Sequence, residues 1–483
     1  MASAFAQKKL RVYDAQPVGA VCQSPVNLES MTQGQWIALD GRDCIRSQFP
    51  EIQSMFPAGV FTSTARTLSD APAATSIDAG TCNGVGFFLA SGSVGVSALI
   101  AAQNGTTDWA HASSTAWAAS TQWNSVIYNK GTSQFIVAGS GGDAAAPYII
   151  GTNAGAVDPG KLASKNFATI TTGGTTTTLT QGLAYAPFIV SVTAGSFVSG
   201  ARYRITSIGS TDFTLIGAAS NTVGVEFTAT GVGAGTGTAL TGRTVLCRDT
   251  SLATASGLFY MNDGATVWNA CSGGSTADRR GVCWTGKYFI ATTATVGLIQ
   301  VSSDGVTWVD QNTIMTSTTP SAPVSDGNGT VVINQPSTYA FYVSKDHGAT
   351  WRVILAPAGA QMNLINGPVY ESTILWGGSI SYVNAKFIIP SGSAVKGSLI
   401  SSDGLAWFTE PIQARGSLLQ LGGVAYAYKA GTYCGIKAGT TSALTATEDM
   451  SKFKIPYTGR GGAAADGNIA ASNDMTYIKV RSN

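Results

Sequence analysis

Residues 302–308, Ser-Ser-Asp-Gly-Val-Thr-Trp, form a short motif that recurs along the second half of the chain. Further copies lie at 262–268, 344–351 and 401–407, and a degenerate copy lies at 447–453. The aromatic residues that end successive copies are 40 to 56 residues apart. A fixed motif at this spacing predicts a chain built by repeating one small unit of antiparallel strands.

The composition of the motif has a physical explanation. The Asp carboxylate can accept hydrogen bonds from backbone amides of its own turn, the Gly tolerates left-handed geometry, and the Trp can pack between neighbouring sheets. We therefore assign a structural role, and no catalytic role, to the residues Asp263, Trp268, Asp304, Trp308, Asp346, Trp351, Asp403 and Trp407.

A second element recurs in phase with the motif: a small turn followed by a run rich in β-branched and aromatic residues. Its seven copies lie at 84–89, 131–137, 242–246, 286–290, 329–333, 384–389 and 431–436. Each copy predicts a hairpin turn that leads into the inner strand of a sheet. We expect the last strand, at 468–471 or 476–480, to close the structure beside the first sheet.

The motif resembles the Asp-box repeat of sialidase-type propellers, Ser-x-Asp-x-Gly-x-Thr-Trp. The copy at 344–351 fits all eight positions, and the copy at 302–308 is one residue shorter. The resemblance covers roughly residues 75 to 475 and implies an all-β, seven-bladed β-propeller. It implies little about activity, because these boxes usually lie far from the active centre of a sialidase.

Residues 195–240 interrupt the repeat. Short strands are predicted at 202–207, 212–216 and 225–229, and Phe213, Ile216, Val225 and Phe227 could form a miniature core. The segment closely resembles a small β module that recurs as an insertion in phage tail and fibre proteins, on the residues Tyr203-x-Ile205, Thr211-Asp212-Phe213-Thr214 and Phe227-Thr228-Ala229-Thr230-Gly231. The alternative is an ordinary surface loop.

Residues 1–70 carry no box. Three runs resemble the tail-collar motif of phage fibres, although the downstream part of that motif is not evident: Pro17-Val18-Gly19-Ala20-Val21, Gly34-Gln35-Trp36-Ile37-Ala38-Leu39-Asp40-Gly41-Arg42 and Arg46-Ser47-Gln48-Phe49-Pro50-Glu51-Ile52. The resemblance implies an attachment unit that docks on the tail; the alternative is a hairpin and helix that cap the propeller. The predicted organisation is an attachment segment at 1–70, propeller parts at 71–194 and 241–483, and the inserted module at 195–240.

Composition narrows the possible functions. Charged residues make up 11% of the chain and the formal net charge is +2, so no broad basic field for nucleic acid is expected. The seven cysteines form no C-x-x-C pair and only two histidines are present, so we expect buried free thiols and neither a metal nor a cofactor. The chain shows no signal peptide and no apolar run of membrane-spanning length, which predicts a soluble protein made in a cytoplasm.

The sequence also argues against an enzyme. A sialidase needs an arginine cluster, a Tyr–Glu nucleophile pair and an acidic proton donor, and other glycosidases need two carboxylates about 5–10 Å apart. Glu226, Glu371, Glu410 and Glu448 stand in no suggestive setting, and the most visible acids are those of the boxes. The alternative that remains is a polysaccharide-degrading propeller enzyme, either sialidase-like or a depolymerase.

The resemblances imply a structural protein of a bacteriophage tail: a fibre, a receptor-binding protein, or a nozzle or adaptor. Its expected partners are other tail proteins, bound through the N-terminal segment, and a host cell-surface glycan or protein; a homo-oligomer is also implied. The expected location is the tail of the virion. Trp109 and Trp117, outside the clear boxes, are candidates for stacking on a sugar ring.

Overall fold

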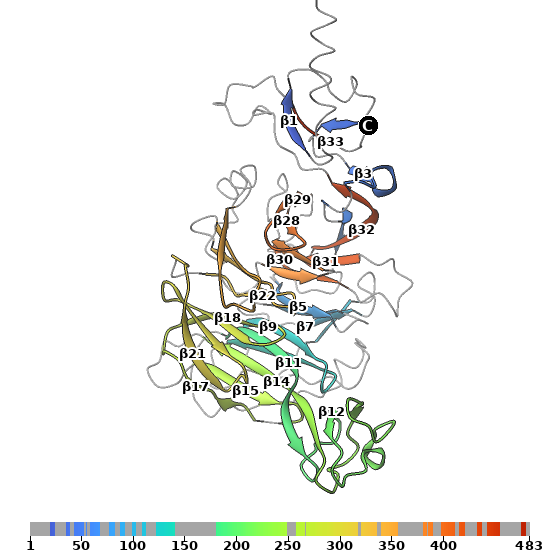
Figure 1. Cartoon of the computed structure of the whole chain (residues 1–483), viewed down its shortest axis with the longest axis vertical. Coiled ribbons are helices and arrows are strands. Elements are labelled where there is room, and N and C mark those ends of the chain that lie inside the picture. The colour runs from blue at the N-terminus through green and yellow to red at the C-terminus, as the bar shows by residue number, and fades with distance from the viewer. Residues whose placement is uncertain are drawn as a thin grey trace, which may run out of the picture.

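The computed structural model describes residues 20–24, 35–38, 43–52, 55, 58–67, 77–82, 87–91, 99–102, 109–112, 122–140, 180–248, 257–265, 267–316, 320–335, 340–355, 380–383, 385–389, 398–410, 415–420, 432–436, 442–454 and 475–479. These residues are all-β, apart from two 3-10 helices, η1 (Arg46–Gln48) and η2 (Phe213–Ile216). They form eight sheets (Figure 1).

Seven of these sheets follow one another along the chain. The first two consist of β5 (Ile77–Cys82), β6 (Phe87–Ser91), β7 (Leu99–Ala102) and β8 (Trp109–Ala112), and of β9 (Gln122–Asn129) and β10 (Gln134–Ser140). The third consists of β11 (Thr180–Thr193), β12 (Arg202–Ser207), β13 (Glu226–Thr228), β14 (Thr238–Arg248), β15 (Leu258–Asn262) and β16 (Asn269–Ala270). The fourth consists of β17 (Ser272–Gly273), β18 (Arg279–Trp284), β19 (Phe289–Thr293), β20 (Leu298–Ser302) and β21 (Thr307–Asn312).

The remaining sheets contain the C-terminal half of the repeat. The fifth and sixth consist of β22 (Val324–Ser325), β23 (Val331–Gln335), β24 (Ala340–Ser344) and β25 (Arg352–Leu355), and of β26 (Ser381–Val383), β27 (Lys386–Ile389), β28 (Ser398–Ser401) and β29 (Phe408–Glu410). The seventh consists of β30 (Arg415–Gln420), β31 (Thr432–Ile436) and β32 (Ser442–Lys454), with β3 (Asp43–Ile45) and β4 (Ala58–Thr67) at its edge. The eighth is separate from this series and consists of β1 (Val21–Ser24), β33 (Met475–Lys479) and β2 (Trp36–Ala38).

The first antiparallel strand of each of the seven sheets contacts the corresponding strand of the next. The succession runs β5, β9, β11, β18, β22, β26 and β30, and β30 contacts β5 again. We call these seven sheets the ring. The fourth sheet packs against the third on one face and against the fifth on the other, which explains why β19, Phe289-Ile290-Ala291-Thr292-Thr293, is buried at every position.

All seven recurrent β-rich runs predicted from the sequence contain strands, namely β6, β10, β14, β19, β23, β27 and β31. Our assignment of these runs to the inner strand is wrong. Each run pairs with the strand that contacts the neighbouring sheets and lies outside it. That strand comes directly before the run in the chain, except that β12 and β13 of the inserted segment stand between β11 and β14. The hairpin turn in each run therefore leads outward from the inner strand.

Strands from the N-terminal and C-terminal parts of the chain pair in two sheets, and neither pairing is the predicted one, in which the last strand lies beside the first sheet. β33 does not join the first sheet; it lies between β1 and β2 in the eighth sheet, with Trp36 opposite Lys479. The seventh sheet is instead extended by β4, which pairs with β32 from Ser442 opposite Thr67 to Phe453 opposite Ala58. Residues 58–67 of the predicted N-terminal segment thus belong to the ring, and residues 475–479 of the predicted second propeller part lie with the N-terminal strands.

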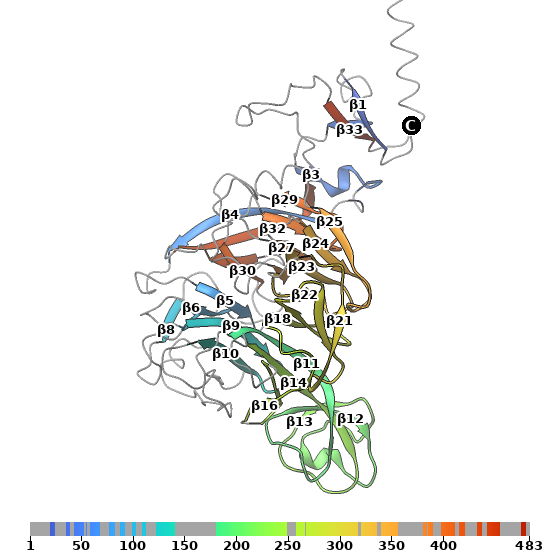
Figure 2. The same ribbon diagram turned by 90° about the vertical axis from the view of Figure 1, so that its left-hand side faces the viewer.

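The N-terminal residues pack against the C-terminal part of the chain. Ile37, Cys44 and Ile52 form a buried cluster with Phe453 and Ile478. The rings of Phe49 and Phe453 meet edge to face, with centroids 6.2 Å apart. This cluster joins the eighth sheet to the ring, and Figure 2 shows that sheet at one end of the long axis.

The inserted segment projects from the third sheet as a compact module. β11 and β14 pair from Thr180 opposite Arg248 to Thr193 opposite Thr238, so the two strands leave the ring together and carry residues 194–237 at their tip. Phe197, Tyr203, Phe213 and Phe227 form its aromatic core, and Ile216 and Val225 pack with them. The predicted miniature core is therefore present.

Two predicted strands of the module, at 202–207 and 225–229, correspond to β12 and β13. The third is wrong: residues 213–216 form the helix η2, because the Asp212 carboxylate accepts a hydrogen bond from the Thr214 amide and caps the turn. The module lies at the opposite end of the long axis from the eighth sheet (Figures 1 and 2).

Candidate functional site

Three of the recurrent motifs form the same hydrogen-bonded turn. The Oδ1 atom of Asp304 accepts hydrogen bonds from the amides of Val306 and Thr307 at 2.8 and 2.9 Å, and from the Ser302 hydroxyl at 2.9 Å. The Ser302 hydroxyl oxygen in turn accepts a hydrogen bond from the Gly305 amide. The motif thus closes on itself, with the carboxylate at its centre.

The turn at Asp403 repeats this pattern, and the turn at Asp346 varies it by one residue. Asp403 accepts from the amides of Leu405 and Ala406 and from the Ser401 hydroxyl. Asp346 accepts from the Thr350 amide, the Thr350 hydroxyl and the Ser344 hydroxyl. Burial alone would raise the pKa of each carboxyl, but these hydrogen bonds outweigh it and hold the pKa values below the ordinary value. The three carboxylates thus accept their hydrogen bonds from residues of their own turns.

Each of these turns also joins its sheet to the preceding one. Gly404 has a positive φ, and a Cβ atom there would lie 2.9 Å from Val332 and 3.2 Å from Val343 of the fifth sheet. Lys345 of the fifth sheet donates a hydrogen bond to the Asp403 carbonyl at 3.1 Å, and Arg243 of the third sheet donates to the Asp304 carbonyl. The turns therefore act as joints between neighbouring sheets.

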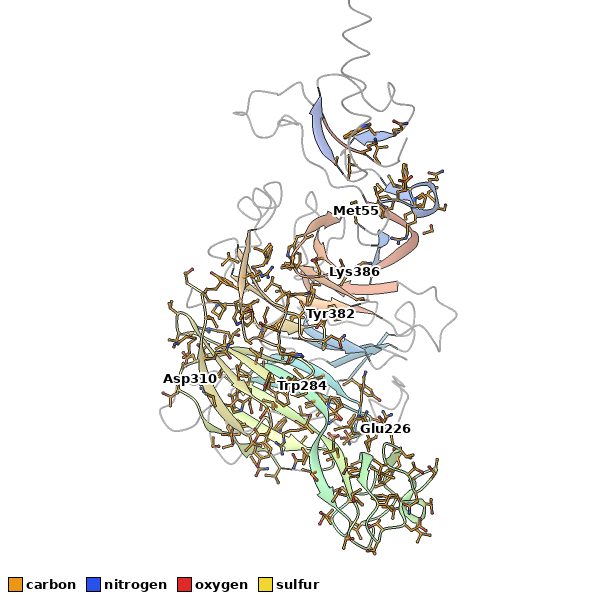
Figure 3. All side chains as sticks on the ribbon, viewed as in Figure 1. Met55, Glu226, Trp284, Asp310, Tyr382 and Lys386 are labelled. Carbon is orange, nitrogen blue, oxygen red and sulfur yellow. The ribbon has the colours of Figure 1, made fainter. Side chains whose placement is uncertain are left out.

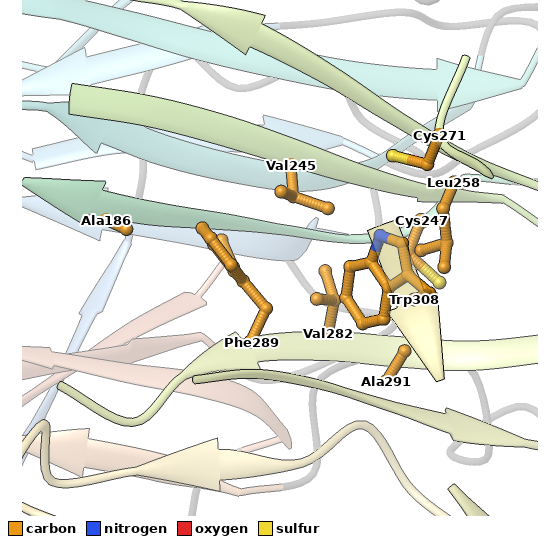
Figure 4. Packing of buried hydrophobic residues seen from close by; sticks show 10 residues of the cluster. Ala186, Val245, Cys247, Leu258, Cys271, Val282, Phe289, Ala291 and Trp308 are labelled. Carbon is orange, nitrogen blue, oxygen red and sulfur yellow. The ribbon is translucent and has the colours of Figure 1, made fainter. Parts of the chain in front are cut away.

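The motif tryptophans lie in the same joints. Trp407 stacks on Phe341 of the preceding sheet with centroids 4.6 Å apart. Trp308 packs in one cluster with Val245, Cys247 and Leu258 of the third sheet (Figure 4). Trp268 packs with Ile136 of the second sheet, and Trp351 packs with residues of the fourth sheet such as Ile290. The side chains of Trp268, Trp308 and Trp407 are buried and that of Trp351 is partly buried, which leaves little of them for a ligand.

Asp263 does not behave like the other motif aspartates, and its assignment to a self-closing turn is wrong. Its Oδ1 accepts a hydrogen bond from the Asn129 side-chain amide at 2.8 Å. Its Oδ2 accepts from the Tyr185 hydroxyl at 2.9 Å and from the Gly242 amide at 3.0 Å. The serine that helps to close the other turns is replaced here by Met261, which is buried in the core.

The Asp263 carboxyl is therefore a link between the second and third sheets. Burial is the largest influence on its pKa and raises it above the ordinary value, against the hydrogen bonds from Asn129 and Tyr185. Burial also raises the pKa of Tyr185. Because the carboxylate and its donors saturate one another inside the protein, the network has a structural role.

Of the two tryptophans proposed for sugar stacking, only Trp109 lies within the described residues. Trp109 begins β8, where it lies opposite Ala102. Trp117 lies outside the described residues. The two strand-borne glutamates Glu410 and Glu448 lie on β29 and β32, in the sixth and seventh sheets, while Glu371 lies outside the described residues.

The described residues offer no centre for metal chemistry, because none of their His, Cys, Asp and Glu side chains gather in groups of three or more that could hold an ion. The thiols of Cys44, Cys247, Cys271 and Cys283 are buried and form no disulfide, as the sequence predicts. No helix in the described part of the chain is long and apolar enough to cross a membrane.

Sequence reasoning missed a cluster at the neck, where the module leaves the ring. The guanidinium of Arg204 lies over the ring of Phe188, 4.1 Å from its centre, and that of Arg202 lies at 5.8 Å. Both arginines pair with Glu226, which Figure 3 labels at this neck. The alternation of Arg202 and Arg204 along a strand was the available signal, since it places both on one face.

No family model and no curated protein matches the chain. Among solved structures, the chain is similar to YCF48 bound to a D1 peptide, with 11% identity, a TM-score of 0.45, and 82% of this chain and 98% of that chain covered. It is also similar to virginiamycin B lyase from Staphylococcus aureus, with 7% identity, a TM-score of 0.45, and 80% and 99% covered. A third is the Swd1 β-propeller domain of Myceliophteria thermophila, with 8% identity, a TM-score of 0.41, and 80% and 99% covered.

These likenesses concern the fold alone. The chain is an all-β protein of antiparallel sheets that matches β-propeller structures. The proteins matched differ from one another in function, so nothing about activity follows from them.

Proposed function

We propose that the chain is a structural protein of a bacteriophage tail, which attaches through its N-terminal segment and presents a seven-bladed β-propeller for assembly or host-surface binding. The observation that carries this proposal is the placement of two segments at opposite ends of the molecule. The sheet that contains the tail-collar-like strand β2 lies at one end, and the module that resembles insertions of phage fibres lies at the other (Figures 1 and 2). Such an arrangement suits a protein that docks by one end and displays the other.

The seven-bladed architecture is supported by the closed succession of contacts from β5 to β30 and back to β5. Pairing between β4 and β32 joins the two halves of the chain within the seventh sheet, as propellers do when they close their ring. We assign the turns at Asp304, Asp346 and Asp403 to the Asp-box class on their hydrogen bonds. We do not assign the turn at Asp263 to this class, because its carboxylate accepts hydrogen bonds from Asn129 and Tyr185.

A non-catalytic role is supported by the interactions of five of the described acids. The carboxylates of Asp304, Asp346 and Asp403 bind their own turns, Asp263 binds the second and third sheets, and Glu226 binds two arginines. A glycosidase needs one carboxylate free to protonate and another free to attack or to activate water. These five acids are committed to structure instead.

Within this proposal the N-terminal segment docks on other tail proteins, the protein assembles as a homo-oligomer in the virion, and the exposed surface contacts a host glycan or protein. The test combines mass spectrometry of purified particles with incubation of the purified chain on host surface polysaccharide. We expect the chain among the virion proteins, and retention on the polysaccharide without new reducing ends. Absence from particles would overturn the tail assignment, and release of reducing ends would overturn the non-catalytic role.

A further inference from the structure

The neck of the module holds a strained aromatic residue. β11 is irregular between Ala186 and Val190, where its register with β14 shifts, and Phe188 lies in this bulge with φ of 52°. A positive φ in a residue other than glycine is energetically unfavourable and persists only where surrounding contacts maintain it. Bulges of this kind turn a side chain out of the regular strand pattern. Here the bulge carries the Phe188 ring to the guanidinium groups of β12.

Besides the Phe188 ring, the Glu226 carboxylate also contacts both arginines. Glu226 lies opposite Arg204 in the pairing of β12 with β13. Its Oε1 accepts hydrogen bonds from Nε and Nη2 of Arg204 at 3.0 and 2.5 Å, and its Oε2 accepts from Nη2 of Arg202 at 2.5 Å. The hydrogen bond from Arg204 is the largest cause that lowers the pKa of Glu226. The cluster of Phe188, Arg202, Arg204 and Glu226, which we call the neck cluster, therefore carries one net positive charge.

Most of the donors of the neck cluster remain available. Each guanidinium has five N–H groups, and Glu226 uses one from Arg202 and two from Arg204. Both arginine side chains are 45% exposed. The aromatic ring of Phe188 and the carboxylate of Glu226 already fix the planes of the two guanidinium groups. Ordering these groups on binding a ligand would therefore cost little free energy.

The other charged residue of the module is already in use. Asp212 caps η2, where it binds the amide and hydroxyl of Thr214. The exposed residues around the neck cluster on β12 and β13, such as Thr206 and Thr228, are neutral hydroxyl residues. The formal net charge of the module is zero, but its positive charge is concentrated at the two arginines of the neck cluster, whereas the charge of Asp212 lies at η2. Planar guanidinium groups match carboxylate and phosphate oxygens in geometry as well as in charge.

We infer that the neck cluster is a binding site for an oxyanion, the carboxylate or phosphate group of an acidic glycan, with Arg202 and Arg204 as the donors. Phe188 and Glu226 are positioning residues that hold the two guanidinium groups. The inference rests on the proposed function as a surface binder, and it names the chemical class of ligand that the module recognises.

The test is calorimetric titration of the full chain with sodium glucuronate, with inorganic phosphate and with neutral glucose. We expect binding of an anion in the millimolar range that weakens at high salt, and none of glucose. A preference for glucuronate identifies a sugar acid as the source, and a preference for phosphate identifies a phosphorylated glycan. Arg204→Gln should weaken binding about tenfold, in line with the loss of charged hydrogen bonds.

Two further variants make the result independent of misfolding. Glu226→Gln keeps an amide oxygen that can still accept hydrogen bonds from the guanidinium groups, but it removes the negative charge that opposes an anion. It should therefore tighten binding a few-fold, an effect that a damaged fold would not give. Arg352→Gln, at an exposed arginine of β25, should leave binding unchanged. The inference is overturned if neither anion binds, if glucose binds equally well, or if Arg204→Gln binds like the unaltered chain. These outcomes are independent of whether the chain is found in particles, so the two proposals fail separately.

Discussion

Asn129 donates a hydrogen bond from its side-chain amide to the carboxylate of Asp263 over 2.8 Å, across 134 residues of sequence. The same Asn129 side chain accepts hydrogen bonds from the amides of Gly131 and Thr132, so it is oriented by its own turn. This pair binds the second sheet to the third. The link lies where the module leaves the ring, because the amide of Arg202, at the start of β12, donates a hydrogen bond to the Gly131 carbonyl.

Replacement of Asp263 should therefore be costly. In Asp263→Ala, the buried donors of Asn129, Tyr185 and Gly242 lose their acceptor, and unsatisfied buried polar groups destabilise a fold by about 1–3 kcal/mol each. We expect a loss of about 3 kcal/mol in the free energy of unfolding, measured by guanidinium titration. The control is Asp212→Ala, at an exposed capping residue, which should cost about 1 kcal/mol. Equal losses would contradict the linking role of Asp263.

The pH dependence of stability should have opposite signs at Asp403 and Asp263. The pKa of Asp403 is lowered in the folded protein, so its contribution is present above the unfolded pKa and is lost as pH falls through the folded value. The pKa of Asp263 is raised, so its favourable contribution is present below the unfolded pKa and is lost as pH rises through the folded value.

Unfolding measured between neutral and acidic pH distinguishes the two cases. Asp403→Asn should reduce the acid-induced loss of stability relative to the unaltered chain, and Asp263→Asn should increase it. If both variants shift the pH profile in the same direction, the proposed difference between the two aspartates does not hold.

The joint made by Gly404 can be tested against a glycine in open space. Both Gly404 and Gly224 have positive φ, but a Cβ atom at Gly404 would meet Val332 and Val343, whereas at Gly224 nothing lies within 4 Å. Gly224→Ala should cost about 1 kcal/mol from backbone strain alone. Gly404→Ala should cost about 1–3 kcal/mol more, because the extra methyl group overfills the joint between the fifth and sixth sheets. Thermal unfolding of the two variants gives the comparison, and similar losses would show that the turn does not press on the preceding sheet.

The ring should fold without the module. Thr193 and Thr238 are paired neighbours on β11 and β14, so an Asn-Gly turn can replace residues 194–237 without changing the register. The chain has ten tryptophans and none falls between 195 and 240, so tryptophan fluorescence reports on the rest of the protein. We expect a cooperative unfolding transition close to that of the full chain, and its loss would mean that the module is part of the ring's core.

Local signals predicted much of this fold, because each repeat carries its own turn chemistry. The seven β-rich runs are strands, and the motifs at Asp304, Asp346 and Asp403 form turns around the carboxylate. The motif at Asp263 shares the Asp-Gly pair and the final tryptophan, yet its carboxylate binds Asn129, a residue that no local pattern connects to it. The difference lies at Met261, where the other copies supply a serine hydroxyl.

Long-range features could not be predicted in this way. Pairing of β4 with β32 joins segments that are far apart in the sequence, and the composition of residues 58–67 does not predict which strand they pair with. The neck cluster depends on a bulge that reorients Phe188, and bulges follow from the register of two strands rather than from one. The sequence does show Arg202 and Arg204 on one face of a strand; only the fold adds Phe188 and Glu226 around them.

We propose above that the chain attaches to a phage tail through its N-terminal sheet and that the module points away from the attachment site. Electron microscopy of purified particles decorated with a gold-labelled antibody fragment against the module tests this most directly. The account predicts gold on the tail at a constant distance from the tail surface. Particles that stay unlabelled, while the same antibody binds the protein in infected cells, would contradict it.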